Sequence, residues 1–197
     1  MKKVICLCLT ALLLCPAACG LAGGIGGLWD SPTATPAPYT FSFRSGIQWN
    51  MTRELVRALE TQELTERVNG NWSILIPLAP VEVSRYKADL VYMFLNDQLK
   101  MISYDFGSGG TESDYQYLTG ALDSVYGEHA EPNAAEILIY LDLIYPGHYS
   151  ADNLLNRRGW TASDGTLVYL YYYSPTAYTI LYVCPGAGQA GYNTAGL

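Results

Sequence analysis

The C-terminal third of the chain contains the stretch that decides the fold, residues 160–184, with the sequence WTASDGTLVYLYYYSPTAYTILYVC. Within it, Asp164 and Gly165 form a dipeptide that favours a tight hairpin turn. Residues 160–162, 166–173 and 178–184 are rich in aromatic and β-branched side chains, which fit a pleated sheet surface. This part of the chain is therefore predicted to be β-structure.

Tyrosine is unusually frequent, with 17 copies, and many of them fall in predicted strands. Because side chains alternate between the two faces of a strand, Tyr169, Tyr171 and Tyr173 should share one face, which Tyr178 and Tyr182 could join from the neighbouring strand. One interpretation is a sheet face packed under helices. The other is an exposed aromatic platform for a protein or glycan partner, and these five tyrosines are its candidate binding residues.

Two helices have clear start signals. Thr52 can cap the first, with Glu54 close to its positive end. Thr111 begins the second, where Asp114 is placed like the acidic member of a capping box, and Gly127 is expected to end it. Both segments carry apolar residues at helical spacing, so each should pack one face against a sheet.

Two further segments complete the predicted helices. Residues 134–145 could form a helix or a strand, and their length and lack of turn signals favour a helix. Ser150 can cap a short helix over residues 151–156.

Strands are also expected between the first two helices, over residues 72–79, 81–95 and 99–106, with turns at Asn69-Gly70 and Asn96-Asp97. A helix followed by strands thus occurs over residues 44–106 and again over residues 111–184, as a loose duplication. The predicted fold class is α+β: two tandem helix-then-strands units in one antiparallel sheet, with helices packed on one face.

The N-terminus carries an export signal. Lys2 and Lys3 precede an uncharged apolar run and small residues, so residues 1–18 are predicted to be a signal peptide. Residues 17–20, AACG, are similar to the site where bacterial lipoproteins are cut and lipidated, which would place the lipid on Cys19. Pro16 departs from that pattern, because an aliphatic residue is usual there. Simple secretion, with cleavage near residues 20–22, is the alternative.

The rest of the chain divides by composition. Residues 19–38 are rich in Gly, Ser, Thr, Ala and Pro and predict a flexible tether. Residues 39–184 form a single predicted domain, and residues 185–197 a disordered tail. Without the signal peptide the chain keeps nine basic and 18 acidic residues, a formal net charge of −9. This charge argues against a nucleic-acid partner, so membrane contact is expected only through the anchor at Cys19.

Residues 43–56, FRSGIQWNMTRELV, resemble a motif of small envelope lipoproteins in which a strand, a Gly-Met-Thr/Ser turn and an amphipathic helix follow one another. Outer-membrane assembly lipoproteins of the BamE/SmpA type carry it, β-lactamase-inhibitor proteins share the helix-then-sheet unit in tandem, and exported clostridial proteins of unknown function carry a related version. Asn50 replaces the turn glycine, which suits a left-handed residue. The resemblance implies the fold and an envelope location, and it transfers no catalytic residue.

Few residues indicate chemistry. His129 and His148 are the only histidines and lack metal-site spacing, so neither a metal nor another cofactor is predicted. Glu54, Glu60, Glu63 and Glu66 are interpreted as a solvated face. Cys184 is expected to be a small core residue.

The leading functional hypothesis is a non-catalytic lipoprotein that binds or scaffolds an envelope protein or glycan. An inhibitor-like module is a subtype of the same hypothesis. The alternative is a cell-wall-directed hydrolase that uses a carboxylate pair, which the sequence alone does not identify.

Overall fold

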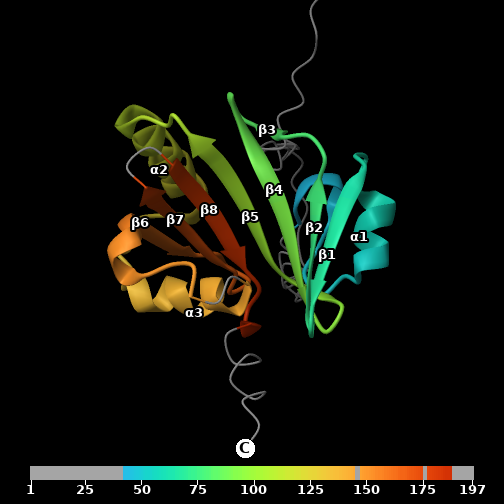
Figure 1. Cartoon of the computed structure of the whole chain (residues 1–197). Helices are drawn as coiled ribbons and strands as arrows, with labels where there is room; N and C mark the ends of the chain where they lie inside the picture. Colours follow the sequence, from blue (N-terminus) through green and yellow to red (C-terminus); the bar gives the residue numbers. More distant parts are fainter. Residues whose placement is uncertain (1–41, 145–146, 175–176, 188–197) are drawn as a thin grey trace, which may run out of the picture. The chain divides into compact units, whose positions relative to one another are not determined.

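An antiparallel sheet of eight strands organises this computed structural model, which describes residues 42–144, 147–174 and 177–187. Seven strands follow the order β1-β2-β4-β5-β8-β7-β6, and β3 pairs with β4 outside this path (Figure 1). The strands are β1 (Leu64–Asn69), β2 (Trp72–Pro77), β3 (Val81–Val83), β4 (Tyr86–Leu95), β5 (Gln98–Ser108), β6 (Leu155–Thr161), β7 (Leu167–Ser174) and β8 (Ala177–Val183). The predicted continuous antiparallel sheet is confirmed.

Three α-helices and two 3₁₀ turns complete the described residues. They are α1 (Arg53–Leu59), α2 (Glu112–Tyr126), α3 (Ala134–Ile144), η1 (Arg44–Gly46) and η2 (Ala151–Asn153). None of the helices in the described ranges is long and apolar enough to cross a membrane. The predicted signal peptide, Cys19, the tether and the tail beyond residue 187 lie outside the described residues.

Local sequence signals place the helix ends and the hairpins. The Thr52 hydroxyl accepts a hydrogen bond from the amide of Leu55, and Thr111 and Asp114 form the predicted capping box. Asn96 and Asp97 have φ angles of 50° and 61°, the left-handed conformation that a two-residue hairpin turn requires. Asn50, at φ 64°, is left-handed as well, in agreement with its place in the turn motif.

Helices cover both faces of the sheet, whereas one face was predicted. On β7, Val168, Leu170 and Tyr172 pack with α2, while the alternate residues Tyr169 and Tyr171 pack with α3. Helices α2 and α3 must therefore lie on opposite faces, because side chains alternate along a strand.

The register of the sheet assigns α1 to the same face as α2. Tyr92 of β4, which packs in one core cluster with Val56 of α1, lies opposite Ile102, and Ile102 lies opposite Tyr182. Tyr182 in turn lies opposite Val168 on the α2 side. Directly opposed residues of antiparallel strands share a face, so α1 and α2 cover one face and α3 covers the other.

The connection from α2 to α3 passes around the edge strand β6. Ala130 and Gly159 exchange two backbone hydrogen bonds of 2.9 Å, so this connection pairs with the outer side of β6. Arg157 of β6 also donates from Nε to the carbonyl of Pro132, at 3.0 Å. The middle of the outer edge of β6 is therefore covered.

The structure differs from the sequence-based prediction at three elements. Strand β1 was not predicted, because five of its six residues are exposed and give no alternating pattern. The predicted strand over residues 81–95 is divided into β3 and β4 at Ser84, which is left-handed at φ 56°. The predicted helix over residues 151–156 is only the 3₁₀ turn η2, since β6 begins at Leu155.

Candidate partner-binding surface

The five predicted binding tyrosines do not form an exposed platform. Tyr169 and Tyr171 are buried under α3, with 6% and 2% of their surface exposed, and Tyr173 is half-buried on the same face. Tyr178 and Tyr182 lie on the opposite face, because Tyr171 is paired with Thr179. The platform hypothesis is wrong for this set, and the alternative of a face packed under a helix describes Tyr169 and Tyr171.

An exposed aromatic cluster does occur elsewhere, where the turn between β3 and β4 meets the first turns of α2. Ser84, Arg85 and Tyr86 come from the turn and the start of β4, and Asp114 and Tyr117 come from α2. This group is called the Arg85–Tyr117 surface below. The left-handed Ser84 turns the chain here, and the capping box fixes the start of α2.

Arg85 contacts two tyrosine rings, those of Tyr86 and Tyr117, which also meet each other edge to face with centroids 5.9 Å apart. Its guanidinium carbon is 4.3 Å from the ring centroid of Tyr117 and 5.0 Å from that of Tyr86, within the range of cation–π attraction. Its Nε donates to the Tyr86 hydroxyl at 2.8 Å. The hydroxyl groups of Ser84 and Tyr117 are hydrogen-bonded at 3.0 Å. The Arg85 guanidinium and the Tyr117 ring are thus both held in place.

Asp114 of α2 contacts both Tyr86 and Arg85. Its Oδ1 accepts a hydrogen bond from the Tyr86 hydroxyl at 2.9 Å and lies 3.6 Å from Arg85 Nη2. Hydrogen bonds from Thr111 and Tyr86 hold the pKa of the Asp114 carboxyl below its usual value. Asp114 is therefore a stable anionic support for Arg85 at neutral pH.

Exposure distinguishes this cluster from the core tyrosines. Tyr117 is 42% exposed and the Arg85 side chain 57% exposed, although both are fixed by the contacts above. Tyrosine and arginine are the residue types most enriched at the energetic centres of protein interfaces. Sequence reasoning missed this surface because Arg85 and Tyr117 are 32 positions apart and neither belongs to a motif.

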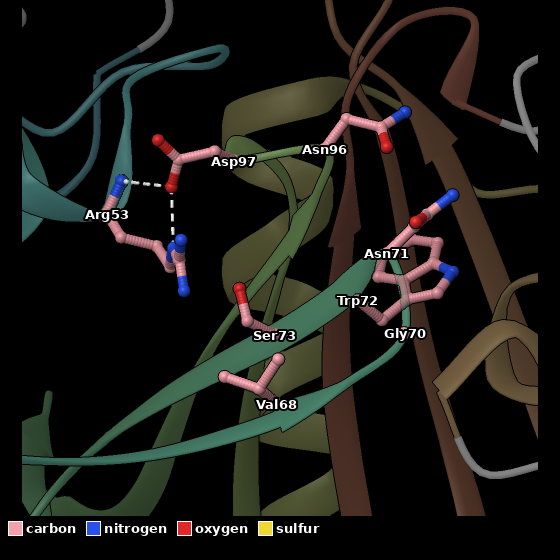
Figure 2. A pocket seen from close by; sticks show the side chains of 8 residues that line it. All are labelled: Arg53, Val68, Gly70, Asn71, Trp72, Ser73, Asn96 and Asp97. Atoms are coloured by element: carbon pink, nitrogen blue, oxygen red, sulfur yellow. Dashed lines mark hydrogen bonds and ion pairs between the residues drawn. The ribbon is translucent and has the colours of Figure 1, made fainter.

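A polar hollow lies at the other end of the molecule's α1 face, at the tips of the β1–β2 and β4–β5 hairpins. Figure 2 shows Arg53 reaching toward Asp97, with Val68 and Ser73 on the two neighbouring strands. Arg53 Nε is 2.5 Å from Asp97 Oδ1, and Arg53 Nη1 is 2.6 Å from Glu66 Oε1. The hollow has a volume of about 230 Å³, which suits a single side chain.

Glu60 is buried, which contradicts its interpretation as part of a solvated face. Its side chain has 0% exposure, and its Oε2 accepts a hydrogen bond of 2.6 Å from the Tyr92 hydroxyl. Its Oε1 lies 3.3 Å from Arg44 Nη2 and accepts from the amide of Thr61. The reason is that α1 ends at Leu59, so Glu60 leaves the helical spacing and turns toward the sheet.

The two histidines have structural surroundings. Nδ1 of His129 is 2.9 Å from Asp123 Oδ1, which also accepts a hydrogen bond from Trp160 Nε1. Burial alone would raise the pKa of Asp123, but these hydrogen bonds outweigh it and lower the pKa. The His129–Asp123 pair thus fastens the α2–α3 connection to β6, while the His148 ring lies against Tyr149.

A carboxylate pair is present on the α3 face. Asp89 of β4 lies directly opposite Asp105 of β5, an arrangement that is unfavourable for like charges. The Tyr173 hydroxyl donates to Asp105 at 3.1 Å, and burial together with Asp105 raises the pKa of Tyr173 to about 12. This opposed pair is the candidate carboxylate pair for the alternative hydrolase hypothesis. No group of acidic, histidine and cysteine side chains suited to a metal ion is found among the described residues.

Cys184 is a core residue as predicted, with 3% of its surface exposed, and burial raises the pKa of its thiol.

Comparison with known proteins finds no matching family model, curated protein or solved structure. The resemblance to envelope lipoproteins therefore remains a prediction, and the candidate residues are those that this structure itself identifies.

Proposed function

We propose that this protein is an exported, non-catalytic binding module, held at the cell envelope by a lipid on Cys19, and that the Arg85–Tyr117 surface contacts a protein partner. The observation that carries the proposal is an exposed guanidinium held against two tyrosine rings that also contact each other. Side chains that are already ordered lose little conformational entropy on binding, so more of the contact energy contributes to affinity.

The chemistry of the surface supports a protein partner. Rings of Tyr86 and Tyr117 offer apolar area with polar tips, and Arg85 offers donors that suit a carboxylate or a backbone carbonyl. The export signal and the tether, as read from the sequence, would present this surface outside the cytoplasm.

The partner contact is tested by photo-crosslinking in intact cells, with a photoreactive amino acid at Ser113, one helical turn before Tyr117. Tyr117→Ala and Arg85→Ala should each remove most of the crosslinked product, because truncating a central interface residue costs about 1–2 kcal/mol or more. Val125→Ser is the matched control, since Val125 is 51% exposed farther along the same helix. It should leave crosslinking unchanged.

Equal crosslinking in all variants would contradict the proposal.

The hydrolase alternative rests on the Asp89–Asp105 pair. Release of soluble fragments from purified cell walls that is lost in Asp105→Asn would replace the binding proposal with an enzymatic one.

Anchoring is tested separately through Cys19. The native protein should partition into detergent and carry the mass of a lipidated N-terminal cysteine, whereas Cys19→Ser should be released or left unprocessed. A mature N-terminus at Gly23, measured by mass spectrometry, would show that the chain is secreted without a lipid.

A further inference from the structure

The two ends of the sheet differ in how they are covered. The outer side of β6 pairs with Ala130, as described above. At the other end, β1 pairs with β2 on its inner side, and no described strand pairs with its outer side. An edge of this kind presents unpaired backbone donors and acceptors to any extended segment.

The alternation of hydrogen-bonded and non-bonded pairs along β1 and β2 identifies which backbone groups of β1 face outward. The amide of Leu78 donates to the carbonyl of Glu63, and residues that bond across an antiparallel pair alternate with residues that do not. Thr65, Arg67 and Asn69 therefore bond to β2. The backbone groups of Leu64, Glu66 and Val68 point away from the sheet.

One arginine of β1 is not matched by a described carboxylate. Glu66 is neutralised by Arg53 and Arg57, with contacts of 2.6 and 2.5 Å, and Arg53 also contacts Asp97. Arg67 projects from the other face of β1, is exposed, and makes no ion pair with a described residue. Arg67 therefore offers a positive charge on the α3 side of this edge, in a chain whose net charge is −7.

The hollow in Figure 2 lies at the end of this edge. Val68, which is 64% exposed, and Ser73 directly opposite it belong to its lining, with the Arg53–Asp97 pair beside them. A side chain of a strand added next to β1, on the α1 side, could enter it.

We propose that β1 is a docking edge that accepts an extended, acidic segment of a partner protein as an additional antiparallel strand. Outward backbone groups of Leu64, Glu66 and Val68 make the hydrogen bonds, and Arg67 pairs with an acidic side chain on the α3 side. A second copy of this chain is the competing occupant, because two-fold pairing centred on Thr65 would place Arg67 opposite Glu63. The dependence of amide protection on protein concentration distinguishes the two occupants.

The test measures amide hydrogen exchange of the full-length protein by NMR, with the acetylated and amidated peptide SVDVDVS as the probe. In the free protein, the amides of Leu64, Glu66 and Val68 should exchange at least about tenfold faster than those of Thr65, Arg67 and Asn69. The peptide should slow the first three amides. The same peptide with lysine in place of aspartate should not.

Two variants sharpen this experiment. Arg67→Glu should reverse the preference between the aspartate and lysine peptides. Glu66→Pro should abolish binding while the β2 amides stay protected, because it removes an outward backbone donor. The carboxylate lost with it pairs with Arg53 and Arg57, so its loss only adds positive charge, which by itself would favour the aspartate peptide. If Glu66→Pro unfolds the protein, the peptide preference of Arg67→Glu still tests the proposal. Protection of all six amides in the free protein, an unchanged preference in Arg67→Glu, or no slowing by the aspartate peptide would overturn the proposal. Protection that grows with protein concentration alone would assign the edge to a second copy and overturn it as well.

Discussion

Replacing Tyr171 with alanine is expected to lower the free energy of unfolding by about 3–5 kcal/mol, as for other large core aromatics. The side chain is 2% exposed and packs in the same core cluster as Ile137 and Leu141 of α3. Its removal would leave a cavity between β7 and α3, because the closely packed neighbours of the side chain can relax only in part. Urea unfolding of the purified variant measures the loss.

Val125→Ala is the control for this experiment, since Val125 is 51% exposed on α2. Its free energy of unfolding should stay within about 0.5 kcal/mol of that of the unmodified protein. A loss below 1 kcal/mol in Tyr171→Ala would mean that Tyr171 is not in the core, and would restore the exposed platform as a hypothesis.

Replacing Glu60 with alanine is expected to cost about 2–3 kcal/mol of unfolding free energy, because it removes a fully buried carboxylate that pairs with the partly exposed Arg44. The Tyr92 hydroxyl would lose its acceptor, and Arg44 would keep a charge without its carboxylate. Burial and Glu60 together raise the pKa of Tyr92, so this hydroxyl stays protonated and needs an acceptor at any physiological pH. Chemical unfolding at neutral pH measures the cost.

Glu63→Ala is the control, because Glu63 is exposed only three positions along the chain and should be nearly neutral. Tyr92→Phe should cost about 1.5–3 kcal/mol, the contribution of a hydrogen bond to a charged group. In the double variant the two costs should not add, since both changes break the same contact. Additive losses would contradict the proposed Glu60–Tyr92 coupling.

Turns and caps were the most predictable parts of the fold. Asn96-Asp97, Asp164-Gly165 and the Thr111 capping box each act through local backbone chemistry, which is the same in the sequence and in the folded chain. The helical state of residues 134–144 also followed from local pattern. The face covered by this helix did not, because it depends on the path of the α2–α3 connection around β6.

Features that depend on tertiary contacts were missed. Strand β1 is polar and exposed, so its only strand signal is its pairing with β2. Glu60 looked solvated because its spacing continues the polar face of α1, although the helix ends one residue earlier. The Arg85–Tyr117 surface joins a turn to a helix, and no property of either segment alone indicates the stacking of Arg85 on Tyr117.

The pairing of Ala130 with β6 limits how many edges of this sheet can accept a further strand. A sheet open at both ends can gain neighbours in two directions and grow into a ribbon, in which every molecule is an internal link. Of the two ends of the seven-strand path, only β1 has no described segment paired with its outer side, so a strand gained at β1 is not continued through β6. Strand addition at β1 would then give one-to-one complexes that stop growing, even at high protein concentration.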